Sequence, residues 1–162
     1  MATIDANVTI FEGYNITAEK LTSIQGEIFQ NLEVGEFQNY LLSELDKIKM
    51  SLLDYQQEFA NSTSQKGNIS EEIFGLLYNG YIRFKERIEA LKDDIYNNLP
   101  SSDFKDYLLE ELSKIQMLIL TYQQTFNNNY CPNNKVKNDI DYNLQLRIDE
   151  INEKIKKDGL SL

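Results

Sequence analysis

The clearest pattern in the chain is a stripe of large apolar residues that recurs at every third or fourth position. Between residues 37 and 59 the steps are 4, 4, 3, 4, 3 and 4, and the same steps return between residues 104 and 126. Such steps place side chains on one face of an α-helix. Burying seven of them contributes roughly 10–20 kcal/mol before backbone ordering is counted, so each helix needs a packing partner. The stripes are Phe37, Leu41, Leu45, Ile48, Leu52, Tyr55 and Phe59, then Phe104, Leu108, Leu112, Ile115, Ile119, Tyr122 and Phe126.

The two stripes lie in two segments of closely similar sequence. Residues 40–59 and 107–126 are identical at 13 of 20 positions, at an offset of 67. The similarity continues upstream at the same offset, more weakly, and predicts a duplicated helical hairpin whose two copies share one backbone arrangement. The units run from about residue 8 to 61 and from about 75 to 128. The weaker upstream matches are Gly13 with Gly80, Tyr14 with Tyr81, Glu19 with Glu86, Ile28 with Ile95 and Leu32 with Leu99.

Two residues carry the signals of a helix start. Thr17 precedes a helical pattern and has Ile16 and Leu21 in the positions of a hydrophobic staple, so we expect it to cap a helix. Ser70 is placed in the same way and is followed by two glutamates, which favour the positive end of a helix. The segment before Thr17 fits a strand, a helical turn or an extended arm.

A further apolar stripe predicts a C-terminal helix at about residues 136–158. Gly159 suits the end of this helix, because glycine readily adopts the left-handed backbone conformation that often terminates a helix. The links between helices are short, which implies antiparallel neighbours. We therefore expect a single all-α domain over residues 1–162, with about five helices in an up-and-down bundle or a short stack of hairpins. The expected links are 33–35, 61–69, 99–102 and 130–135, and the last stripe is Val136, Ile140, Leu144, Ile148, Ile151 and Ile155.

Charge restricts the class of partner. The chain has 26 acidic and 16 basic side chains, a formal net charge of −10. Such a surface repels nucleic-acid phosphates and anionic membranes, so neither is an expected partner, whereas a basic protein is. There is no apolar run of membrane-spanning length and no signal peptide, and Cys131 is the single cysteine. These features predict a cytoplasmic or otherwise intracellular protein.

Catalytic chemistry has little support in the sequence. There is no histidine, no phosphate-binding glycine loop and no nucleophile elbow, so neither a cofactor nor a catalytic site is expected. Adjacent carboxylates point about 100° apart on a helix and do not converge on one proton. No metal site is expected either, although a Mg²⁺ or Ca²⁺ site built from distant acids stays open. The adjacent carboxylates are Glu71–Glu72, Asp93–Asp94 and Glu110–Glu111.

Three positions outside the stripes hold the same residue in both copies. These six residues are the candidate interaction site. Met50, Leu53 and Gln57 return as Met117, Leu120 and Gln124, and their spacing places each triad on a second helix face. One interpretation is that each helix has core neighbours on both sides, with methionine as a gap filler. The other is a pair of docking patches, in which methionine adapts to a partner and glutamine supplies donors and acceptors.

Three functions follow in order of preference. The first is a non-catalytic protein that binds another macromolecule as an inhibitor, adaptor or scaffold; by analogy of fold and charge alone, an immunity or counter-defence protein would suit. The second is a helical bundle that holds a small ligand, as in a sensor, and the third is a carboxylate-based enzyme. Leu118 replaces Ser51 of the first copy, so a homodimer through residues near Leu118 is a further hypothesis.

Overall fold

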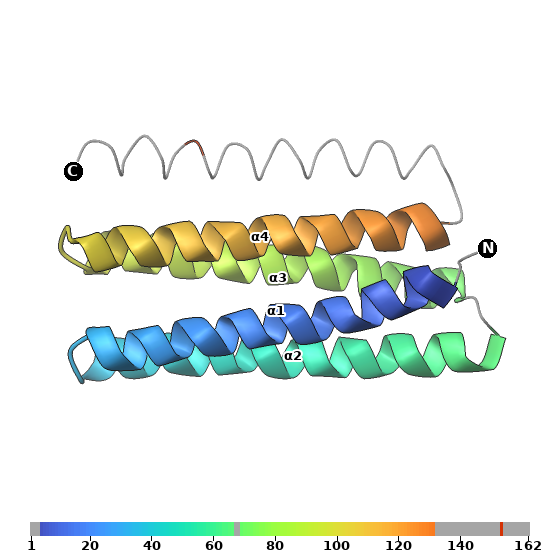
Figure 1. The fold of residues 1–162 in the computed structure, drawn as a ribbon, viewed down its shortest axis with the longest axis horizontal. Coiled ribbons are helices and arrows are strands. Elements are labelled where there is room, and N and C mark those ends of the chain that lie inside the picture. The colour runs from blue at the N-terminus through green and yellow to red at the C-terminus, as the bar shows by residue number, and fades with distance from the viewer. Residues whose placement is uncertain (1–3, 67–68, 132–152, 154–162) are drawn as a thin grey trace.

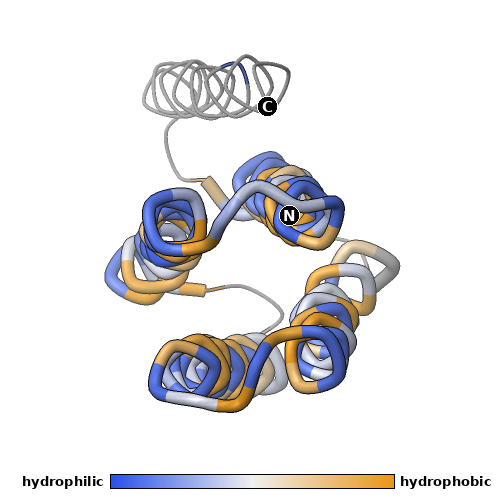
Figure 2. Tube along the Cα trace, turned by 90° about the vertical axis from the view of Figure 1, so that its left-hand side faces the viewer, coloured by the Kyte–Doolittle hydropathy of each residue, from blue (hydrophilic) through white to orange (hydrophobic). Residues whose placement is uncertain are grey.

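The protein is a bundle of antiparallel helices. In a computed structural model, residues 4–66, 69–131 and 153 are described. They form four α-helices, each of which runs antiparallel to the one before it (Figure 1). Viewed along their axes, the helices occupy the corners of a four-sided arrangement (Figure 2). The helices are α1 (Ile4–Asn31), α2 (Glu36–Lys66), α3 (Glu71–Asn98) and α4 (Asp103–Tyr130).

The expected all-α class and bundle architecture are therefore confirmed at the level of these four helices. The fifth expected helix, at about 136–158, lies outside the described residues. α1 packs against α2 and α4, and α3 packs against α4 and less extensively against α2. Within the described part of the chain, no helix is long and apolar enough to cross a bilayer.

The two predicted stripes face the interior. Five of the seven stripe residues on α2 and five of the seven on α4 are buried, and Phe37, Tyr55, Phe104 and Tyr122 are partly buried at its edge. α1 and α3 complete the core, mainly with leucine, isoleucine and aromatic side chains. The buried stripe residues are Leu41, Leu45, Ile48, Leu52 and Phe59 on α2, and Leu108, Leu112, Ile115, Ile119 and Phe126 on α4.

The expected helix start at Thr17 is wrong. α1 already begins at Ile4, and Thr17 lies buried in its middle, where its hydroxyl donates to the carbonyl of Gly13 at 2.8 Å. A threonine hydroxyl bonds the carbonyl four residues back as readily as it caps a helix end, so the local signal is ambiguous. The upstream segment is helical because Ile10 and Tyr14 extend the buried face of α1.

Of the other predicted helix ends, the start of α3 is confirmed and the end of α2 is wrong. Ser70 caps α3, as predicted, by accepting from the Ile73 amide at 3.2 Å. Ser102 caps α4 in the same manner through the Lys105 amide at 3.0 Å. The loop expected at 61–69 is too long, because α2 continues to Lys66.

Contacts between helices recur at positions 67 residues apart. Gly13 of α1 lies against the ring of Tyr122 on α4, and a Cβ atom at Gly13 would come within 2.6 Å of that ring. Gly80 of α3 lies against the ring of Tyr55 on α2, where the corresponding distance is 3.0 Å. The positions that meet across the centre also differ by 67: Tyr14 stacks on Tyr81 at 5.6 Å between centroids, and Phe59 meets Phe126 at 6.2 Å.

Aromatic residues gather in the half of the bundle where α1 and α3 begin. Phe126 is the centre of this cluster, with its ring 5.1 Å from that of Phe74, 5.4 Å from Tyr130 and 5.8 Å from Tyr81. Burial raises the pKa of the Tyr81 hydroxyl well above its usual range. Among the described residues, neither the Tyr81 hydroxyl nor that of Tyr14 has a hydrogen-bond partner of good geometry. The opposite half of the core is aliphatic, with Ile28, Leu41, Ile95 and Leu108.

Candidate functional site

The predicted triad on α2 is a surface feature. The Met50 side chain is 67% exposed and that of Leu53 is 49% exposed. Gln57 is exposed as well, and its amide donates to Asn61 at 2.9 Å. The core-filling interpretation therefore does not describe Met50 and Leu53, which lie on the outward side of α2.

Carboxylates flank this apolar surface. Asp46 precedes Met50 by one helical turn, and exposed Asp54 follows it by one. Asp46 accepts from the Gln25 amide at 2.7 Å and lies 3.9 Å from the ammonium of Lys49. We call Asp46, Met50, Leu53, Asp54 and Gln57 the α2 face; it combines an apolar centre with an acidic border.

The second triad does not form an equivalent surface. Met117 is 37% exposed and Gln124 is partly buried, but Leu120 is only 2% exposed. Its neighbours Gln116 and Gln123 are also buried, and both bond to Lys85 of α3. The triad is thus split between surface and interior, and the sequence signal for this was the nearly unbroken apolar run 117–120.

Two lysine–glutamine pairs between helices, one buried and one partly buried, are a feature that the apolar pattern did not predict. Lys92 of α3 is 1% exposed and donates to Oε1 of Gln116 on α4. In the first hairpin, Lys49 of α2 donates to Oε1 of Gln25 on α1 at 2.8 Å. Positions 25 and 92, and likewise 49 and 116, are 67 apart, so the same pair recurs with its two members exchanged between the helices.

Lys92 titrates unusually because of this environment. Burial lowers its pKa to about 8, and the carboxylates of Glu89 and Asp93 oppose that change in part. A lysine with a lowered pKa can serve as a base or nucleophile when a reactant reaches it. The Lys92 side chain lies inside the packing of α3 on α4 and is 1% exposed.

Two residues 67 positions apart, Gln38 and Lys105, donate hydrogen bonds to carbonyls at the C-terminal ends of α1 and α3. Gln38 donates from Nε2 to the carbonyl of Leu32 at 3.1 Å. Lys105, 67 positions later, donates from Nζ to the carbonyl of Leu99 at 3.0 Å, and its ammonium lies 4.6 Å from the centre of the Tyr96 ring. Carbonyls at a helix end lack partners in the helix, so these side chains satisfy the last turn of each first helix.

The adjacent carboxylates show no convergence on a reactive centre. Asp94 accepts from the hydroxyl of Tyr40 at 2.6 Å, and this hydrogen bond is the main cause that raises the pKa of Tyr40 to about 12. Glu111 and Glu110 both lie near Lys114, at 2.9 and 3.7 Å.

Metal ligands and the single cysteine give no further site. Within residues 4–66 and 69–131, no three acidic or cysteine side chains group closely enough to hold a metal ion. Cys131 is partly buried and ends α4, with its amide donating to the carbonyl of Asn127 at 3.0 Å.

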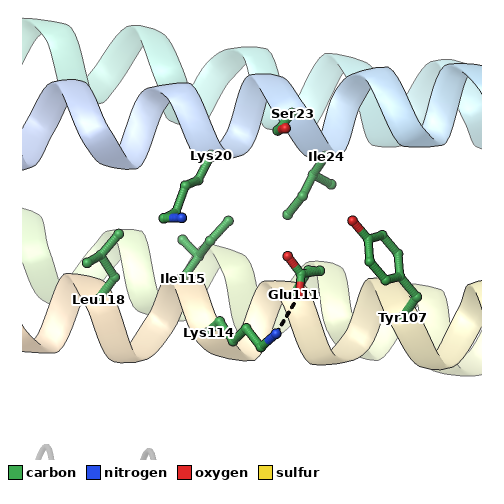
Figure 3. A pocket seen from close by; sticks show the side chains of 8 residues that line it. All are labelled: Lys20, Ser23, Ile24, Tyr107, Glu111, Lys114, Ile115 and Leu118. Atoms are coloured by element: carbon green, nitrogen blue, oxygen red, sulfur yellow. Dashed lines mark hydrogen bonds and ion pairs between the residues drawn. The ribbon is translucent and has the colours of Figure 1, made fainter.

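A groove runs between α1 and α4. Its volume is about 200 Å³. Figure 3 shows the eight side chains that line it. Ile24, Ile115 and Leu118 supply its apolar part. Lys20 and Tyr107 lie toward opposite ends, and Lys114 donates to Glu111 at 2.9 Å along one wall (Figure 3). Leu118, the residue predicted for a homodimer contact, is partly buried here.

Comparison with protein-family models, with curated proteins and with solved structures finds no match for this chain.

Proposed function

We propose that the protein is a non-catalytic, acidic helical bundle that binds a basic protein through the α2 face, as an inhibitor, adaptor or scaffold. The observation that carries this proposal is the exposure of Met50 and Leu53 between Asp46 and Asp54. Methionine adapts to varied partner surfaces, and an acidic border steers and orients a basic partner. The net charge of −10 acts in the same direction.

The alternative functions have weaker support. A chain without histidine lacks the usual general base, which argues against an enzyme. The α1–α4 groove, at about 200 Å³, is smaller than the roughly 300–1,000 Å³ of drug-sized ligand sites. An intracellular location and an immunity or counter-defence role accord with the acidic surface and stay parts of the proposal.

We also infer that the bundle consists of two copies of one hairpin, the units of about 8–61 and 75–128. The support is the recurrence of contacts at an offset of 67: the reciprocal glycine–tyrosine contacts, the central ring pairs and the lysine–glutamine pairs. In addition, α3 begins and ends 67 residues after α1. In this view the α2 face is the copy that stayed exposed, whereas burial of Leu120 altered the face on α4.

The α2 face is tested by adding charge at its centre. The double variant Met50→Asp/Leu53→Asp is compared with Val34→Asp/Leu76→Asp, which adds the same two charges at exposed apolar positions away from the face. Because all four side chains are exposed, we expect both variants to keep the wild-type melting temperature within a few degrees. Each tagged chain captures proteins from the cells that produce it, and the captured proteins are quantified by mass spectrometry and then measured pairwise by calorimetry.

We expect a basic protein that binds the wild type and the control variant equally, and binds Met50→Asp/Leu53→Asp at least tenfold more weakly, since carboxylates would then be desolvated at the apolar contact. Equal binding by both variants would exclude the α2 face as the site. Capture of a second copy of the chain would support the homodimer hypothesis at Leu118 instead.

A further inference from the structure

The groove between α1 and α4 corresponds, at the offset of 67 residues, to the contact between α2 and α3. Between α2 and α3, Tyr40 donates to Asp94 at 2.6 Å and ties the two helices together. The position of Tyr40 in the other seam is taken by Tyr107, and that of Asp94 by Glu27. Among the described residues the Tyr107 hydroxyl has no hydrogen bond, and burial, followed by the Glu111 and Glu27 carboxylates, raises its pKa. The hydroxyl therefore stays protonated and available as a donor.

The filling of the two seams differs as well. Between α2 and α3, the ring of Phe84 meets that of Tyr55 edge-on at 5.3 Å. The residue 67 positions before Phe84 is Thr17, whose hydroxyl bonds within α1, and whose side chain is much smaller than a phenyl ring. Thr17 is buried and does not line the groove, which lies further along α1 at Lys20, Ser23 and Ile24.

The polar groups of the groove are mainly donors without partners. Within the part of the chain that the structure describes, neither the ammonium of Lys20 nor the hydroxyl of Ser23 has a hydrogen bond or ion pair, and Tyr107 adds a third free donor. The other cation, Lys114, is held by Glu111. Hydrogen-bond acceptors on a ligand would pair with these exposed donors, and a negative charge would complement Lys20.

The size and floor of the groove define the rest of the ligand. Ile24, Ile115 and Leu118 offer an apolar surface, and the space of about 200 Å³ exceeds the roughly 150 Å³ of a dry cavity that holds benzene. One ring with a short arm fits this space. The acidic surface of the whole protein opposes an anion only weakly, because charges beyond about 8 Å are screened at physiological salt.

We propose that the α1–α4 groove binds a small carboxylate with an apolar body. The carboxylate pairs with the Lys20 ammonium, the body lies on Ile24, Ile115 and Leu118, and Tyr107 closes the other end (Figure 3). This site is separate from the α2 face and does not depend on it.

The probe is 3-phenylpropanoate, titrated into the full chain with methyl groups of isoleucine and leucine observed by NMR. We expect saturable shifts in the millimolar range, confined to Ile24, Ile115 and Leu118, since a ligand of this size binds weakly. The neutral analogue 3-phenylpropan-1-ol should bind at least threefold more weakly. Failure to saturate, shifts spread over the whole core, or equal binding of the alcohol would overturn the proposal.

Two matched variants assign the charge contact. Lys20→Gln should weaken 3-phenylpropanoate about three- to fivefold, as expected for one exposed ion pair. Arg87 is the cation 67 residues after Lys20, on α3. Arg87→Gln removes it and should leave the affinity unchanged. Loss of the same size in both variants would show general charge attraction rather than this site. Both exchanges replace a cation by a neutral polar side chain, and unchanged spectra of the free variants establish that the fold is retained.

Discussion

At the scale of single residues, Gly13 determines how closely α1 approaches α4. A methyl group at this position would lie 2.6 Å from the Tyr122 ring, far inside van der Waals contact. Alanine normally stabilises a helix interior relative to glycine by about 1 kcal/mol. We expect Gly13→Ala to reverse this sign and to lower the free energy of unfolding by about 1–3 kcal/mol, because Tyr122 or α1 itself must move. Urea unfolding followed by circular dichroism measures the change.

Gly26 provides the control within the same helix. No atom lies within 4 Å of a Cβ atom built there, so Gly26→Ala should add about 0.5–1 kcal/mol to the free energy of unfolding. A Gly13→Ala variant that is stabilised as much as Gly26→Ala would show that the helix contact at Tyr122 is loose.

Hydrophobic spacing identified the stripe residues but not the buried polar ones. Leu45 and Leu112 could be placed in the core because the residues four positions before and three positions after each of them are apolar too. Lys92 and Gln116 are polar residues whose burial depends on their meeting across two helices. A pattern that scores each position separately assigns them to the surface.

At the scale of helices, α3 and α4 are held together by a lysine–glutamine contact that α1 and α2 make with the residues exchanged. The reversed arrangement is thus already present in the molecule, as Gln25 with Lys49. We expect the double variant Lys92→Gln/Gln116→Lys to retain most of the wild-type free energy of unfolding. Gln116→Lys alone places two ammonium groups together in the packing, which should destabilise by at least about 2 kcal/mol.

A double-mutant cycle by urea unfolding separates the pair from its surroundings. The coupling energy between positions 92 and 116 should be about 1–3 kcal/mol in favour of the double variant. Additive effects of the two single changes would mean that the two positions do not recognise each other.

The existence of the four helices could be predicted from the sequence more readily than their ends or outer faces. Stripes on α2 and α4 run over many turns, so chance produces them rarely. Thr17 was misassigned because a hydroxyl serves a helix interior and a helix end alike. The equal treatment of Leu53 and Leu120 failed for another reason: identical residues in similar segments acquire different exposure when their neighbours differ.

At the scale of the whole molecule, Lys92 links stability to pH. Its pKa is about 8 in the folded protein against an ordinary value of 10.5, so the unfolded chain binds more protons between these values. The contribution of Lys92 to stability therefore rises with pH across this window, with each pKa unit corresponding to about 1.4 kcal/mol. Lys92→Met should be relatively most stable below pH 8, and its advantage over the wild type should shrink toward pH 9.5.

The quantity measured is the difference in free energy of unfolding between variant and wild type at pH 7 and at pH 9.5. The loss of the Lys92–Gln116 hydrogen bond changes the free energy of unfolding by the same amount at both pH values, so it cancels in this comparison. The titration of the buried tyrosines at higher pH is common to variant and wild type and cancels as well. Lys47→Met removes an exposed ammonium and serves as the reference. A difference that stays constant with pH for Lys92→Met would show that Lys92 is fully hydrated.

The one-sided distribution of the fully buried aromatic residues decides what spectroscopy can observe in this protein. The chain has no tryptophan, and its buried tyrosines in the described residues, Tyr14, Tyr78, Tyr81 and Tyr130, all lie in the half where α1 and α3 begin. Near-ultraviolet circular dichroism, which depends on immobilised rings, therefore reports mainly the melting of that half, with a smaller contribution from Tyr40 and its hydrogen bond to Asp94. Far-ultraviolet dichroism reports all four helices together. Coincidence of the two signals thus measures whether the aromatic and aliphatic halves unfold as one cooperative unit.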